Sequence, residues 1–192
     1  MAHVLARLAG YGLVLTPYWP FGFEHHPTAP GAVLVTHGRQ QALVDPAKPT
    51  GHPGVVDVTG GPTHPYWLIE TSQFAMAWPA GYALESPSDP HDTTPFYLHG
   101  PDGQLIFPQG PAVLTGPDAL VAPGQTVLQR GSTAGAEVVE VGYQHEGDAW
   151  WQAHFLLPHG EHHTLVLTAQ SRHADAAGTR AAAQSMLPGA GR

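Results

Sequence analysis

The chain has 192 residues, a length that fits one domain, or one domain with a small extension, and allows a sizeable core. Charged residues make up only 11% of it, while glycine and proline number 23 and 20, so we expect short strands and tight turns. The net charge of −8 argues against nucleic acid and anionic membranes as partners, and the absence of cysteine excludes disulfides, thiolate zinc sites and cysteine nucleophiles.

The first third of the chain alternates short apolar segments with proline and glycine. We expect strands at residues 12–16, 32–37, 41–45 and 55–59, and a loop at residues 46–54. No segment resembles a signal peptide or a membrane span, so we expect a cytoplasmic protein. The predicted organisation is a β-rich N-terminal extension at residues 1–62 and a main domain at residues 63–192, with one single domain as the alternative.

Four aromatic rings lie within six residues of the N-terminal extension, at Tyr18, Trp19, Phe21 and Phe23. Such a segment is costly to expose and too irregular for an ordinary strand. It either caps the core or presents its rings to a partner. Trp19 and Phe21 are therefore candidate binding residues.

The middle of the chain contains the clearest hairpin. We expect one long or bulged strand at residues 66–78 and a strand at residues 82–85. Residues 95–99 and 104–108 flank Gly100-Pro101-Asp102-Gly103, where proline presets one turn position and glycine accepts a positive φ.

Residues 137–170 predict an antiparallel meander whose register follows from loop length. A three-residue loop at 146–148 would pair Val141 with Ala153 and Val139 with Phe155. A loop at 158–162 would pair Phe155 with Leu165. Both loops select the same buried face, on which Phe155 and Val141 lie together.

The opposite face of this meander is mixed in polarity. It carries Trp150, Gln152 and His154 beside Leu156 and Val166. Such a face is either covered by another part of the chain or forms the floor of a binding groove. Trp150, Gln152 and His154 are the candidate binding residues of the sheet.

The C-terminal segment predicts a helix at residues 172–187, with Ser171 as a candidate cap and Pro188 as a stop. Its apolar stripe consists of Ala176, Thr179, Ala183, Met186 and Leu187.

The order of elements resembles the PsbP-like superfamily over residues 66–190. The Trp-Pro-x-Gly-Tyr step at residues 78–82, the Gly-Pro-Asp-Gly hairpin, the meander and the closing helix carry this resemblance. It implies an α+β fold, in which an antiparallel sheet carries a C-terminal helix and, here, a β-rich N-terminal extension. Members of the superfamily mostly act as non-catalytic partners, including DcrB-type proteins and chaperones for secreted bacterial effectors.

Histidine is unusually frequent, and the densest cluster is His159, Glu161, His162 and His163 in a predicted loop. These side chains could converge on a divalent metal, although the spacing matches no zinc motif and solvated loop histidines are the alternative. No serine elbow or phosphate loop occurs. Carboxylates such as Glu140 and Glu70 could form a catalytic pair, but the sequence does not bring any two together.

We therefore expect a non-catalytic module, chaperone-like or of another accessory type, that has no cofactor and engages a protein or peptide partner through its sheet. A metal-dependent enzyme or small-ligand protein that uses the His/Glu cluster remains the alternative. The sequence does not indicate the oligomeric state.

Overall fold

The computed structural model describes residues 5–8, 13–15, 21–29, 32–37, 40–44, 67–89 and 91–188. The chain forms two compact units, Met1–Leu98 and His99–Arg192. The sequence instead predicts a boundary after residue 62. The difference arises because β6 (Trp67–Glu70) pairs with β1 (Leu5–Leu8) and so joins the N-terminal strands.

The first unit contains a four-stranded antiparallel sheet in the order β2 (Leu13–Leu15), β1, β6 and β7 (Ala75–Ala77). The expectation of one strand over residues 66–78 is wrong. Thr71 forms a tight turn instead, because its backbone N–H donates to Phe74 O at 2.8 Å and its hydroxyl accepts from the Phe74 N–H at 3.0 Å. The chain therefore reverses between β6 and β7.

The first unit also contains a second run of antiparallel strands. β3 (Phe21–His25) pairs with β4 (Val33–His37) and β8 (Ala83–Glu85), and β5 (Gln40–Val44) pairs with β4. Of these, β4, β5 and β8 match the expected strands at 32–37, 41–45 and 82–85, whereas β3 lies in the aromatic segment that we expected to be too irregular for a strand. The expected strand at 55–59 and the loop at 46–54 lie outside the described residues.

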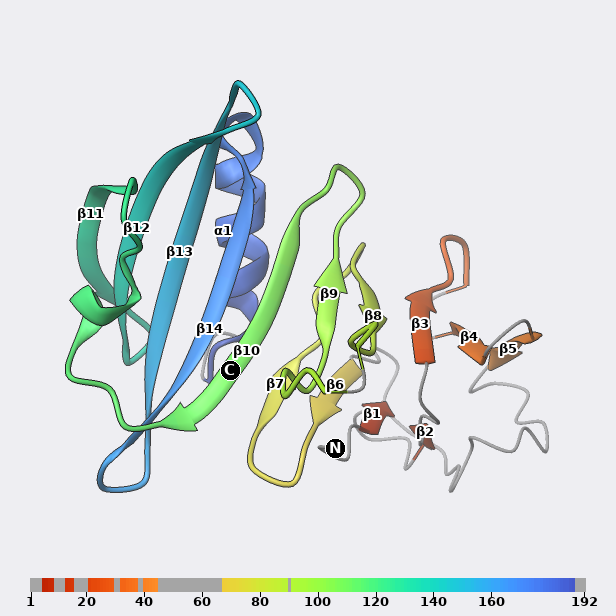
Figure 1. Cartoon of the computed structure of the whole chain (residues 1–192). Helices are drawn as coiled ribbons and strands as arrows, with labels where there is room; N and C mark the ends of the chain where they lie inside the picture. Colours follow the sequence, from red (N-terminus) through yellow and green to blue (C-terminus); the bar gives the residue numbers. More distant parts are fainter. Residues whose placement is uncertain are drawn as a thin grey trace. The chain divides into compact units, whose positions relative to one another are not determined.

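Within the second unit, five long antiparallel strands pair side by side and are followed by a helix (Figure 1). The strand order is β11 (Thr126–Thr133), β12 (Ala136–His145), β13 (Asp148–His159), β14 (His163–Arg172) and β10 (Leu105–Ala112). The 3-10 helix η1 (Pro117–Leu120) lies in the connection from β10 to β11, and η2 (His173–Asp175) leads into α1 (Ala176–Met186). The helix α1 packs against β14, and it also touches β10 and β13.

The expectation of an α+β fold needs correction. The described residues form fourteen strands, including β9 (Tyr97–His99), and a single α-helix of 11 residues. The protein is therefore mostly antiparallel sheet with one C-terminal helix. The expected turn before β10 is present, since the Gly100 N–H donates to Gln104 O at 2.8 Å and Gly103 has φ 74°.

The register predicted between β12 and β13 is wrong by one residue. Val141 pairs with Gln152 and Val139 with His154, because the turn contains only Glu146 and Gly147, both with positive φ. Side chains alternate across a strand, so a shift of one residue moves Val139 and Val141 to the face opposite Phe155. Val141 and Phe155 are both fully buried, but on different faces.

The register predicted between β13 and β14 is shifted by two residues. Phe155 pairs with Leu167, and the loop is Gly160–His162 rather than residues 158–162. A shift of two preserves the face, so the buried set on one side is as expected. It consists of Trp151, Ala153, Phe155, Leu157, Leu165, Leu167 and Ala169.

The helix α1 buries the stripe that its sequence predicts. Ala176, Thr179, Ala183 and Met186 are buried, and Leu187 follows with 3% exposure. Ser171 does not cap the helix; its hydroxyl donates to Arg172 O at 2.9 Å, and η2 intervenes before α1 begins. Within the described ranges, no helix combines the length and apolar character needed to cross a membrane.

Candidate functional site

The face of the second unit's sheet that lies opposite α1, here called the outer face, carries Trp150, Gln152 and His154, which alternate with the helix-side residues along β13. Residues 113–125, here called the strap, lie over part of this face. In the strap, Leu114, Leu120 and Val121 pack on a buried cluster of Val139, Val141 and Leu156. The outer face is therefore partly covered by the chain itself, through the strap.

Two polar contacts tie the strap to the sheet. Gln125 donates from Nε2 to Gln152 Oε1 at 2.9 Å, while its Oε1 accepts from the Ala122 N–H at 2.8 Å. Asp118 forms an exposed ion pair with Arg130 on β11. Gln152 is thus engaged by the strap rather than open to a partner.

His154 is buried beneath this face, with 5% of its surface exposed. Its Nδ1 lies 3.0 Å from Thr168 Oγ1, which in turn donates to Gln109 Oε1 at 3.4 Å. His154 Nδ1 and Thr168 Oγ1 thus share one hydrogen bond, and His154 Nε2 has no hydrogen-bond partner within the described residues. Burial lowers the pKa of His154 to about 4, so the side chain is neutral at physiological pH.

Trp150 lies half-buried near the start of β13. Its ring stacks on Tyr143 at a centroid distance of 6.3 Å and meets His145 edge-on at 6.2 Å. The structure thus places Trp150, Gln152 and His154 on one face. Phe21 lies in β3 of the first unit, and Trp19 lies outside the described residues.

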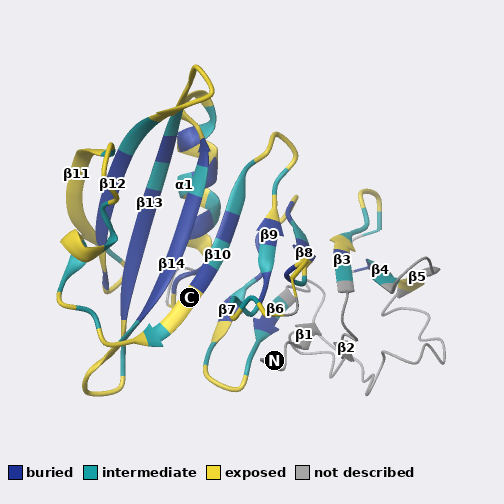
Figure 2. Ribbon diagram, in the orientation of Figure 1, coloured by how far each residue is buried: buried dark blue, intermediate teal, exposed yellow. Residues whose placement is uncertain are grey.

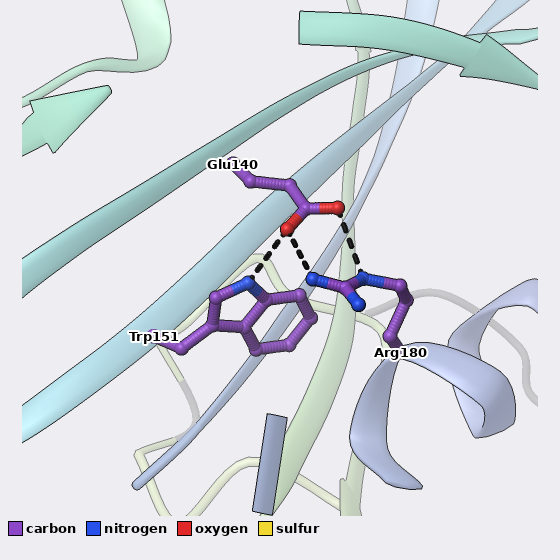
Figure 3. Close-up of polar contacts among 3 residues, drawn as sticks. All are labelled: Glu140, Trp151 and Arg180. Carbon is purple, nitrogen blue, oxygen red and sulfur yellow. Dashed lines mark hydrogen bonds and ion pairs between the residues drawn. The ribbon is translucent and has the colours of Figure 1, made fainter. Parts of the chain in front are cut away.

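On the helix side, the buried Glu140 holds α1 to the sheet (Figure 3). Its carboxylate accepts from Trp151 Nε1 at 2.9 Å and from Arg180 Nε at 3.0 Å, and Arg180 Nη2 donates to it as well. The Arg180 guanidinium also lies 5.2 Å from the centroid of the Trp151 ring. A carboxylate satisfied by three donors in this way fixes the helix. Glu70 lies in the first unit and Glu140 in the second, so their pairing stays a prediction.

The histidine cluster lies at the turn between β13 and β14. Glu161, His162 and His163 line an open hollow of about 430 Å³, together with Glu137, Leu156 and Pro158. Leu114 and Gly116 of the strap form another wall, and His159 does not line it. In the part of the chain that the structure describes, no group of three or more His, Cys, Asp or Glu residues is placed to hold a metal ion. The metal site stays a prediction.

The most exposed element of this unit is β11, which forms the end of its strand order (Figure 2). All of its residues except Thr133 are exposed, and Val127 and Leu128 expose 36% and 49% of their surfaces. No described strand pairs with its outer edge. This edge offers a row of backbone N–H and C=O groups to a further strand.

Sequence reasoning did not find β11. Its polar residues and Gly131 obscure the strand pattern over residues 126–133. The feature of the sequence that could have indicated β11 is Gly135 in the turn that follows it. In the structure Ala134 and Gly135 both have positive φ, as a tight hairpin requires. Glu137 lies within the predicted meander, but its place in the lining of the hollow depends on the strap and the β13–β14 turn, which the sequence did not bring together.

Comparisons with known proteins give little guidance. No family model matches the chain, and no curated protein matches it. A solved structure, that of LpqN involved in cell envelope biogenesis of Mycobacterium tuberculosis, is 16% identical and matches over 56% of this chain and 68% of that one, with a TM-score of 0.26. At this TM-score the likeness supports no inference about fold or function. The resemblance to the PsbP-like superfamily stays a prediction.

Proposed function

We propose that the protein is a non-catalytic binding module whose second unit takes up an extended peptide segment of a partner protein along the outer edge of β11. The observation that carries this proposal is the edge itself, which is exposed and unpaired within the described residues. An extended peptide adds to such an edge by main-chain hydrogen bonds, while its alternate side chains contact the strand's neighbours.

The composition of β11 supports this role. Edge strands are commonly protected by prolines, by charged side chains or by being very short. β11 has eight residues without proline, and its one charged side chain, Arg130, is paired with Asp118. A bulge near Leu128 interrupts the pairing with β12, so Gln129–Thr133 forms the regular part of the edge. A partner strand therefore has about five residues of regular edge to pair with.

Exposed apolar side chains at the start of β11 add specificity to this edge. Val127 and Leu128 occupy adjacent positions, and Leu128 also packs over Gly142, with atoms 3.3 to 3.5 Å from the place that a Cβ would take there. Val127 pairs with Val141 of the outer face, while Leu128 lies over Gly142 on the helix side. A bound peptide therefore meets an apolar contact on each face of the sheet.

A display library of extended peptides tests the proposal on the full chain. We expect selected peptides to shift the backbone amide resonances of Gln129–Thr133 and to slow hydrogen exchange there. N-methylation at alternate peptide positions should abolish binding, while methylation at the intervening positions should leave it intact, since only one set of N–H groups faces β11.

Variants of the protein supply the matched comparison. Leu128→Lys should weaken peptide binding at least tenfold, whereas Val113→Lys, which replaces a 71% exposed apolar residue of the strap, should leave it unchanged. Both positions are exposed, so both variants should fold. Amide shifts confined to the strap or to the first unit, or equal effects of the two variants, would refute the edge as the binding site.

A further inference from the structure

We propose that the hollow beside the β13–β14 turn takes the basic side chain, arginine or lysine, of the peptide that pairs with β11. This inference rests on the proposed function for the identity of the peptide. The chemistry of the occupant follows from the charged residues of the hollow, from its apolar residues and from its position.

The formal charge of the residues that line the hollow is negative. Glu137 and Glu161 line it, its lining contains no lysine or arginine, and its histidines count as neutral in the formal charge. The arginines of residues 99–188 are already engaged, because Arg130 pairs with Asp118, Arg172 with Asp148 and Arg180 with Glu140. Within the described part of the second unit, no arginine or lysine remains to neutralise Glu137 and Glu161.

The floor of the hollow is apolar. Leu156 is buried at its base, and Leu114 and Pro158 stand beside it. Lysine and arginine bury their aliphatic stems on apolar surface and keep the charged head among polar groups. The buried Leu156, with the exposed carboxylates of Glu137 and Glu161 among the other lining residues, fits that shape. A small anion is disfavoured by the carboxylates, and a purely apolar ligand leaves them unneutralised.

The hollow lies where β11 turns into β12. Gly135 of that turn lines it, and Glu137, two residues later, pairs with Ser132 of β11. A peptide aligned with Gln129–Thr133 therefore ends its pairing at the end of β11 whose turn lines the hollow. The formal net charge of −8 also favours the approach of a basic segment over an acidic one.

The test uses a peptide that binds the β11 edge, with arginine, lysine, norleucine or glutamate placed in turn at each position. We expect one position near the Ser132 end at which arginine or lysine binds at least tenfold more tightly than norleucine, and glutamate more weakly still. The double variant Glu137→Gln/Glu161→Gln should lose this preference. Glu146→Gln, which removes an exposed carboxylate at the other turn of the meander, should keep it.

A second measurement does not depend on the peptide. Titration with n-butylguanidinium chloride should shift the amide resonances of Glu161 and His162 in the natural protein, and should fail to do so in the double variant. If peptides bind the β11 edge without preference for a basic residue and butylguanidinium shifts nothing in the hollow, the hollow is not a cation site although the proposed function stands. If no peptide binds the edge but butylguanidinium binds the hollow, the proposed function fails and the assignment of the cation to that peptide is overturned.

Discussion

Phe155 is fully buried on the side of the sheet that α1 covers. Replacing it with alanine leaves a cavity that neighbouring side chains fill only partly, so Phe155→Ala should lower the free energy of unfolding by ~3–5 kcal/mol. Val113→Ala, at an exposed position, should change it by less than ~0.5 kcal/mol. Urea denaturation followed by circular dichroism measures both. A loss below about 1 kcal/mol for Phe155→Ala would contradict its place in the core.

His154 makes the stability of the second unit depend on pH. Burial lowers its pKa to about 4, whereas histidine in an unfolded chain titrates near 6.5, so the unfolded state binds more protons between these values. The free energy of unfolding therefore falls as pH decreases from 7, by about 2 kcal/mol at pH 5.

The variant His154→Gln isolates this contribution. Glutamine cannot be protonated, so its free energy of unfolding should change less between pH 7 and 5 than that of the natural protein. The comparison between the two proteins is needed because burial also lowers the pKa of His25 in the first unit to about 4, where its ring lies 4.1 Å from that of Trp78. Parallel pH profiles would show that His154 is not the group responsible.

An ion pair between Arg180 and the buried Glu140 contributes to the attachment of α1. Arg180→Leu would leave the carboxylate of Glu140 buried and uncompensated, so it should cost ~2–4 kcal/mol, less than for a fully buried pair because the Arg180 side chain is 36% exposed. The double variant Glu140→Gln/Arg180→Leu should recover part of this loss. Arg172→Leu, which breaks the exposed pair with Asp148, should cost less than ~1 kcal/mol. Similar losses for Arg180→Leu and Arg172→Leu would show that the buried pair does not anchor the helix.

The turn between β12 and β13 offers a stabilising change. Glu146 has φ 54° and is followed by Gly147 with φ 89°, a pair of positive values that asparagine-glycine adopts more readily. Glu146→Asn should therefore raise the midpoint of thermal unfolding, with a gain of up to about 1 kcal/mol. A lower midpoint would mean that the turn departs from this geometry in solution.

The same turn explains why the sequence predicted the faces of the meander only in part. Alternation identifies a register when one face of a sheet is buried and the other is polar. Here Ala153, His154, Phe155, Leu156 and Leu157 are buried in succession, because α1 covers one face and the strap covers the other. With both faces covered, Val139 and Val141 fit either register. The turn length, which the sequence left open, decided it.

The sequence predicted the features that depend on neighbouring residues, but not the contacts between distant segments. The helix stripe and the Gly-Pro-Asp-Gly turn depend on neighbouring residues, and both agree with the structure. The strap over the outer face and the pairing of β6 with β1 join residues far apart in the sequence, which no periodicity reveals. The candidate binding site therefore moves from Gln152 and His154 to β11. Gln152 is bonded to the strap and His154 is buried, whereas β11, which the sequence did not predict, is exposed.

The histidine content predicts how the whole molecule responds to acid. Protonating all 14 histidines would change the formal charge from −8 to +6, so the net charge passes through zero on acidification. Solvated imidazoles titrate near pH ~6.5, and proteins associate most readily where self-repulsion is least. His25 and His154, with pKa values of about 4, contribute little of this charge above pH ~5. We expect solubility to reach a minimum near pH ~6, with light scattering rising while the circular dichroism of the soluble fraction stays native. Loss of the native spectrum before scattering rises would show that unfolding, and not charge neutralisation, drives the precipitation.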